Sequence, residues 1–308
     1  GLFMIKVGYL VSYDYKYIYR SILSVYEHVD AIYLAIDVNH MTWTGNRFNI
    51  EEDFYERIKK LDTKKIIKYY RDEFYIPSLL PMENEVRERN MLLGVMGRGW
   101  LIQLDVDEYV IDFKPLRDIL HKKRYLTYFP FLWPVTIFGN WITMFKKIDN
   151  SYLCIPELSP FSFITNYHSY SHPRKNKRSV YIKAKIPVLH QSWARSSSEI
   201  KQKISNWGHK EDFNVVKYFD FWNSIDSNNF KDVKNFHPLT PNSWTKLVLL
   251  KDSEINNFIK EIGGDEILEI QDLNLGFIIF NRISTERKKI YKKVKYKIRI
   301  LLKINMFL

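Results

Sequence analysis

Two aspartates separated by one residue, directly after a largely apolar run, are the part of the sequence best suited to chemistry. The run covers residues 100–104, and the acids that follow are Asp105, Asp107 and Glu108. Such a run is typical of a strand buried in a parallel sheet. Asp105 and Asp107 would then lie at the carboxyl end of that strand, where open α/β sheets bind ligands. Both carboxylates could reach a hard divalent cation and a diphosphate bound to it.

The segments before this run alternate between strand-like and helix-like patterns. We expect strands at 4–11, 31–36 and 65–70, a further strand from residue 100, and helices at 15–27, 51–60 and 81–96. Pro81 suits the first turn of its helix, and Glu83 and Glu85 favour that helix N-terminus. Alternation of this kind predicts right-handed βαβ units and a parallel sheet.

The pattern changes after about residue 124. Short aromatic segments punctuated by proline run to residue 189 and predict an antiparallel or irregular second half. Residues 125–145 carry no charge and are long enough to cross a bilayer. Pro130, Pro134 and Gly139 instead predict short strands and turns there. Helices are expected at 196–207 and 211–223, and a long polar loop at 224–243.

Composition indicates a folded protein, with 46% hydrophobic and 16% aromatic residues in 308. Cys154 is the single cysteine, which excludes an internal disulfide and suits a reducing compartment. No secretory signal is expected at the N-terminus. The net charge is +12, of which residues 282–308 hold ten Lys or Arg against one acid, or +9, leaving +3 for the rest.

This basic tail also has an apolar face, because Ile290, Val294, Ile298 and Leu301 recur at helical spacing. A basic amphipathic helix is typical of a surface anchor for anionic lipid. A terminal helix packed on its own domain would show the same pattern. Nucleic acid is not expected as a partner, because the tail lacks base-reading residues and the rest of the chain is nearly neutral.

In order and spacing, the first 125 residues resemble a known family. A first strand, a second strand ending in Asp37, a helix with Arg89-Asn90 and the D-V-D-E run resemble the nucleotide half of a family-2-type glycosyltransferase of the GT-A fold. The resemblance implies an α/β, GT-A-like fold with a mostly parallel central sheet flanked by helices, an irregular acceptor-side half and a basic C-terminal helix. It divides the chain into a nucleotide-sugar-binding half (1–124), an acceptor-side half (125–235) and a C-terminal helical region (236–308).

The resemblance also implies roles for individual residues. Asp37 would hold the base or ribose, Tyr13 and Asp14 would flank the base, and Arg89 would approach the phosphates. Asp105 and Asp107 would hold Mn²⁺ or Mg²⁺, which acts as a Lewis acid on the leaving diphosphate. One departure concerns the segment after the second strand, which reads Val-Asn-His where the family commonly has Asp-Gly-Ser.

Further candidates lie late in the chain. His190 matches the placement of a third metal ligand, and imidazole suits manganese better than magnesium; His209 is a second candidate. Arg195 would contact the diphosphate, and Trp193 is either a sugar platform or a core residue. An inverting transfer needs a carboxylate as general base. The candidates are Glu157, Glu211 and Asp212, and Glu157 is favoured because it lies between prolines in an aromatic segment.

The sequence therefore predicts a metal-dependent hexosyltransferase. It would move a sugar from a nucleotide-diphosphate sugar to a hydroxyl of a glycan or lipid-linked acceptor, with inversion, in surface polysaccharide synthesis. We expect it in the cytoplasm, peripheral at the inner face of the cell membrane. One alternative is a nucleotidyltransferase, although residues 11–14 offer no Gly-rich phosphate loop. The other is a nonenzymatic protein that binds glycans or nucleic acid.

Overall fold

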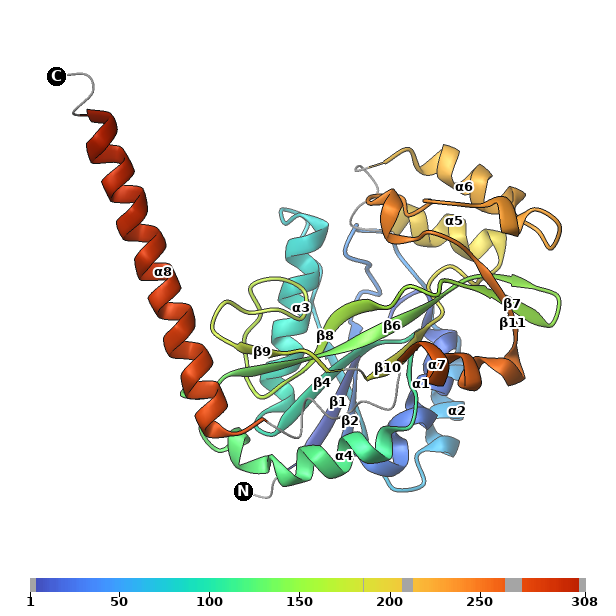
Figure 1. Ribbon diagram of the computed structural model, residues 1–308. Coiled ribbons are helices and arrows are strands. Elements are labelled where there is room, and N and C mark those ends of the chain that lie inside the picture. Colours follow the sequence, from blue (N-terminus) through green and yellow to red (C-terminus); the bar gives the residue numbers. More distant parts are fainter. Residues whose placement is uncertain (1–3, 185, 207–212, 264–272, 305–308) are drawn as a thin grey trace.

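One mixed sheet of eleven strands runs through the described part of the chain (Figure 1). The structure is a computed structural model that describes residues 4–184, 186–206, 213–263 and 273–304. The longest path through the sheet has the order β11-β7-β6-β8-β4-β1-β2-β3. Helices flank the sheet, so the α/β class predicted from the sequence is confirmed.

The first half of the chain forms the parallel part of the sheet. Its strands are β1 (Ile5–Leu10), β2 (Ala31–Asp37), β3 (Ile67–Asp72) and β4 (Trp100–Asp105). β1 pairs in parallel with both β2 and β4, and β2 with β3. The predicted βαβ order is therefore observed.

Helices cover both faces of these strands, which is why β1 and β2 are apolar at almost every position. α3 (Pro81–Met96) packs on one face through Leu92, Leu93 and Met96. α1 (Ile18–Val25) and α2 (Glu52–Leu61) pack on the other. Gly8 allows the close approach of α3, since a Cβ there would lie 2.8 Å from atoms of Leu92 and Met96.

The second half adds mostly antiparallel strands to the same sheet. They are β6 (Val135–Ile148), β7 (Ser151–Cys154), β8 (Ser159–Thr165), β9 (Val180–Ile182), β10 (Pro187–His190) and β11 (Val248–Lys251). The short strand β5 (Glu108–Val110) follows β4 and ends the strands of the first half. β8 joins the two halves by pairing antiparallel to β4. β10 pairs antiparallel to β5 and places His190 opposite Glu108.

The uncharged segment 125–145 begins in a short 3-10 helix (Arg124–Thr127), continues as a loop and then forms most of β6. This agrees with the turns and strands predicted from its prolines, although β6 is one strand of 14 residues. In the described residues, no helix has both the length and the apolar character needed to cross a membrane.

The remaining helices lie around the second half. They are α4 (Phe113–Lys122), α5 (Ser197–Asn206), α6 (Val215–Ser224), α7 (Ile255–Gly263) and α8 (Leu275–Ile304). α4 and α7 were not predicted. α5 and α6 pack over a second core that includes Phe145, Trp222 and Trp244. α8 leaves the body of the protein after its first turns (Figure 1).

Candidate active site

A cleft of about 670 Å³ lies at the carboxyl ends of the parallel strands. β1 ends at Leu10, which is level with Asp105 of β4, and β2 ends at Asp37. Seven predicted site residues line the cleft: Tyr13, Asp14, Asp37, Asp105, Asp107, His190 and Trp193. Residues from β1, β2, β4 and β10 therefore meet in one place, as the strand-end argument requires.

Asp105 is held from behind by two arginines. Arg89 Nη2 donates to Asp105 Oδ1 at 2.9 Å, and Arg174 Nη2 donates to Oδ2 at 3.4 Å. The side chain of Asp105 remains 34% exposed to the cleft. Burial would raise the pKa of Asp105, but Arg174 and Arg89 outweigh burial and lower it. Asp105 therefore presents a charged carboxylate to any ligand in the cleft.

Asp107 is more deeply placed and belongs to a second ion-pair group. Arg195 Nη2 donates to Asp107 Oδ2 at 2.5 Å and to Asp14 Oδ2 at 3.1 Å. His190 Nε2 lies 3.5 Å from the same oxygen of Asp107. Burial raises the pKa of Asp107, yet His190 and Arg195 outweigh it and hold the pKa well below the usual range. One arginine thus links the loop after β1 to the loop after β4.

Glu108, the third acid of the motif, is fully buried and organises the first group. Its carboxylate accepts from Arg174 Nη1 at 2.7 Å and Nη2 at 3.1 Å, from Trp141 Nε1 at 3.0 Å and from the Asp105 backbone N at 2.9 Å. Bidentate pairs of this kind fix both position and orientation. Glu108 therefore positions Arg174 and the backbone of Asp105.

Arg174 adopts a left-handed backbone conformation with φ of 55°. This conformation costs a residue other than glycine about 1–2 kcal/mol, so the surrounding contacts must hold it. Its guanidinium also lies 5.6 Å from the ring centroid of Trp141 and 5.1 Å from that of Phe161. Strained residues of this kind gather at functional sites, and Arg174 lines the cleft.

Asp37 lies at the end of β2 as predicted, but backbone groups use its carboxylate. Oδ1 accepts from the backbone N of Asn39 and Met41, and Oδ2 from that of Phe74 and Tyr75. Four such bonds tie the loop after β2 to the segment after β3. The observed contacts of Asp37 are therefore structural.

Arg89 and Arg195 are each 1% exposed and do not line the cleft. They lie behind the aspartates, where they neutralise the carboxylates that a ligand would meet. Trp193 is also mostly buried, and its ring packs against Phe145 and Tyr218.

Glu157 lies outside the cleft lining, in the turn between β7 and β8. It accepts hydrogen bonds from the backbone N of Thr245 at 3.2 Å and from the Thr245 hydroxyl. Its other oxygen, Oε2, is buried, with no hydrogen-bond partner among the described residues. Asp212, Glu211 and His209 lie outside the described residues.

Lys203 of α5 lines the cleft and was not singled out from the sequence. Burial lowers its pKa, and nearby Arg195 lowers it further, while Asp107 and Asp14 oppose the change. A half-buried cation beside these acids is a suitable group for a phosphate. Arg174 was missed as well, because a basic S-H-P-R-K segment has no local feature that assigns it to Asp105.

The predicted metal ligands bring oxygen and imidazole nitrogen donors, which suit Mn²⁺, and the oxygen donors suit Mg²⁺. Asp107 and His190 are adjacent, and Asp105 faces the same cleft. In the part of the chain that is described, however, no three His, Cys, Asp or Glu side chains form a ready metal centre. The donor types fit, but a cation would have to compete with arginines for the aspartates.

No protein-family model matches the chain, and no curated protein matches it. Among solved structures it is similar to S. aureus TarS, at 13% identity and a TM-score of 0.35, covering 75% of this chain and 45% of that one. For TarS 1-349 the identity is 14% and the TM-score is 0.28, and the match covers 47% of this chain and 36% of that one. For an apo UDP-glucose pyrophosphorylase the identity is 8% and the TM-score is 0.29, and the match covers 61% of this chain and 90% of that one. The chain thus spans less than half of either TarS chain, and TM-scores this low carry no argument about activity.

Proposed function

We propose that the protein is a glycosyltransferase that uses a nucleotide-diphosphate sugar. The observation that carries the proposal is the meeting of Asp14, Asp105 and Asp107 with His190 and Lys203 in one cleft at the strand ends. Carboxylates and cations placed together in this way can bind a diphosphate and a cation that accompanies it. Asp105 would face the donor, because it is the more exposed acid of the motif.

The protein's own cations would hold the donor diphosphate. Lys203 would bind a phosphate oxygen directly, since this residue lines the cleft. A bound Mn²⁺ or Mg²⁺, held by Asp105, Asp107 and His190, would add Lewis-acid stabilisation of the leaving diphosphate. Arg89 and Arg195 would act indirectly, by positioning the two aspartates.

The sugar and its acceptor would occupy the side of the cleft formed by the second half. Trp141 stacks on Phe161 with ring centroids 4.4 Å apart, and both line the cleft with Trp244. Aromatic faces of this kind suit the apolar faces of sugar rings. For the general base we propose Asp212, because Glu157 does not line the cleft and its carboxylate accepts hydrogen bonds from Thr245.

Product analysis tests the proposal. The purified chain is incubated with UDP-, GDP-, CDP- and dTDP-sugars, with Mn²⁺, Mg²⁺ or chelator, and with glycan or lipid-linked acceptors. Release of a nucleoside diphosphate with glycosylated acceptor supports the transferase. Release of a sugar phosphate upon addition of pyrophosphate would identify a nucleotidyltransferase instead. Absence of both reactions with every donor would contradict an enzyme of nucleotide sugars.

A further inference from the structure

Exposed apolar side chains gather where α8 leaves the body of the protein. Of the twenty large apolar side chains that are exposed in the described residues, eleven belong to α8 or to the loop 128–132. Phe280 is 72% exposed, and Phe129 and Phe131 are each 54% exposed. A cluster of this kind on a folded protein marks a binding surface.

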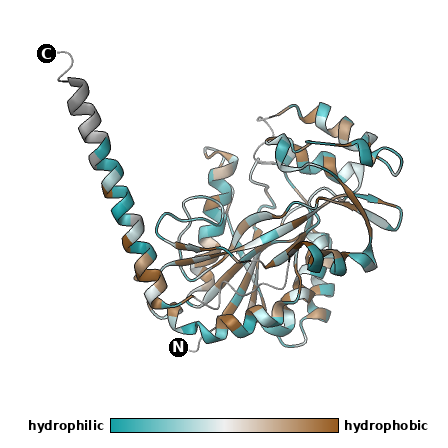
Figure 2. Cartoon of the chain, viewed as in Figure 1, coloured by the Kyte–Doolittle hydropathy of each residue, from teal (hydrophilic) through white to brown (hydrophobic). Residues whose placement is uncertain are grey.

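The two segments are far apart in sequence but lie side by side. Arg282 Nη1 donates to the backbone O of Leu132, which places the loop against the first turns of α8. Phe129 and Phe131 contact each other with ring centroids 6.4 Å apart. We call the cluster of Phe129, Phe131, Leu132, Phe277 and Phe280 the apolar patch. Figure 2 shows apolar residues gathered in these first turns of α8.

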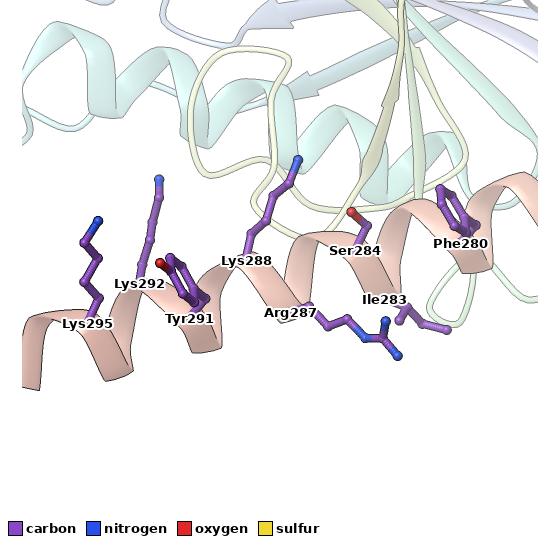
Figure 3. Close-up of a pocket in the computed structure, with 8 residues that line it drawn as sticks. All are labelled: Phe280, Ile283, Ser284, Arg287, Lys288, Tyr291, Lys292 and Lys295. Atoms are coloured by element: carbon purple, nitrogen blue, oxygen red, sulfur yellow. The ribbon is translucent and has the colours of Figure 1, made fainter. Parts of the chain in front are cut away.

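Basic residues continue from the apolar patch along the same helix. Phe280, Ser284, Lys288 and Lys292 follow one another at four-residue spacing, and Lys295 extends to the same side (Figure 3). Lys122 and Arg124 are exposed just before the loop. The apolar patch is therefore bordered by cations on both segments.

We propose that the apolar patch and the basic residues of α8 form one docking surface for a bilayer of anionic phospholipid. The aromatic side chains enter the interface between head groups and acyl chains, while the lysines contact lipid phosphates. α8 lies along the bilayer and does not cross it. The proposal does not rest on the proposed function, because lipid binding is measured without donor or acceptor.

Charge favours a bilayer over a second copy of the chain. Residues 282–308 carry +9, so pairing two such helices would bring like charges together, whereas an anionic leaflet attracts them. Nucleic acid would satisfy the lysines but leave the aromatic loop 128–132 without a role. A bilayer accounts for both features.

The test is co-sedimentation of the full chain with vesicles of phosphatidylcholine alone or mixed with phosphatidylglycerol. We expect binding to the anionic vesicles, weakened by salt. The charge variant K288E/K292E should lose affinity by at least about tenfold. Its matched control is K59E/K60E on α2, which removes the same charge from another exposed helix and should bind as the unmodified chain does.

A second pair of variants tests the apolar patch. F129S/F131S should weaken vesicle binding by at least about tenfold. Val216→Ser, at a residue of α6 that is 68% exposed, should have no effect. Thermal melts confirm that each variant is folded.

Several results would overturn the proposal. One is the absence of binding to anionic vesicles. Another is an equal loss of vesicle affinity in a variant and in its control. Unchanged vesicle binding by F129S/F131S would show that the loop 128–132 is not part of the docking surface. Sedimentation velocity that shows a lipid-free dimer lost on Phe280→Ser would assign the patch to a second copy. Binding of duplex DNA, lost in K288E/K292E without any vesicle binding, would assign it to nucleic acid.

Discussion

The two halves of the sheet contribute opposite charges to the cleft. The first half supplies the acids Asp14, Asp105, Asp107 and Glu108, whereas the second half supplies the cations Arg174, Arg195 and Lys203; Arg89, a cation of the first half, is the exception. The ion pairs that cross between the halves join residues from 66 to 181 positions apart. The acids are positioned by strand ends, and the cations by long-range pairing. The first half therefore supplies the acids of the proposed donor site. The second half supplies the arginines that hold these acids, together with Lys203 and His190, which would bind ligand directly.

Asp105→Asn should separate ligand binding at the cleft from stabilisation of the fold most clearly. Arg89 keeps Glu85 as a partner and Arg174 keeps Glu108, so stability should change by only about 1 kcal/mol. Transfer should fall on the order of 10³-fold, because the exposed carboxylate of the donor site is lost. Donor turnover and urea unfolding of the same preparation measure both. Retained turnover would contradict the role of Asp105.

Arg195→Met should show the reverse, a large loss of stability. It leaves the buried carboxylate of Asp107 and that of Asp14 without their shared arginine, which costs roughly 3–5 kcal/mol. Arg57→Met is the control, because Arg57 and Asp53 form an exposed pair worth less than about 1 kcal/mol. Urea unfolding measures both variants. An equal loss of unfolding free energy in the two variants would mean that the ion pairs between the two halves do not stabilise the cleft.

Lys203→Met tests whether a cation of the second half binds ligand directly. Nucleoside diphosphate affinity should fall about tenfold or more, because a charged hydrogen bond is lost. Lys201→Met on the same helix is the control, since Lys201 is exposed and does not line the cleft. Calorimetric titration with UDP, GDP, CDP and dTDP measures the affinities. Unchanged affinity for the nucleotide that binds would remove Lys203 from the site.

Glu88 gives a pH-dependent test within the first half. Burial raises its pKa to about 8, although a hydrogen bond from Trp43 Nε1 opposes the rise. The folded state therefore binds more protons than the unfolded state between about pH 4.3 and 8, and stability falls as pH rises through that window, by at most about 1.4 kcal/mol per pH unit.

Glu88→Gln should remove this slope, because the amide oxygen can still accept from Trp43 and does not ionise. The melting temperature of the variant should be higher than that of the unmodified chain at pH 8 and about the same at pH 4.5. Glu56→Gln, on the exposed face of α2, should leave the profile unchanged. A slope that survives in Glu88→Gln would assign it to another group.

The first half was predictable because its signals are local. Each strand and helix up to β4 was expected within a few residues, and Asp105 and Asp107 lie at the predicted strand end. A capping role for Asp37 at the strand end was one expectation, and its bonds to Asn39 and Met41 are local. Its bonds to Phe74 and Tyr75 were not predictable, because that segment approaches Asp37 only in the fold. α4 was missed because Pro115 near its start weakens the helical pattern.

The second half was less predictable because its contacts are not local. An antiparallel region was expected, but neither the length of β6 nor the pairing of β10 with β5 follows from periodicity. Arg174 follows β8, and the pairing of β8 with β4 brings it to Glu108, 66 positions earlier in the chain. Hydrophobic patterning thus predicts which segments form strands, but the strand that each one pairs with depends on the tertiary fold.

Ligand-induced stabilisation tests the central claim most directly. UDP, GDP, CDP and dTDP are each added with Mn²⁺, with Mg²⁺ or with chelator, and the melting temperature is recorded. A ligand at a hundredfold its dissociation constant stabilises by about 2.7 kcal/mol. We predict that one nucleotide raises the melting temperature, that a divalent cation increases the shift, and that Asp105→Asn removes the increase. No shift with any nucleotide, with or without metal, would contradict a nucleotide-sugar site in this cleft.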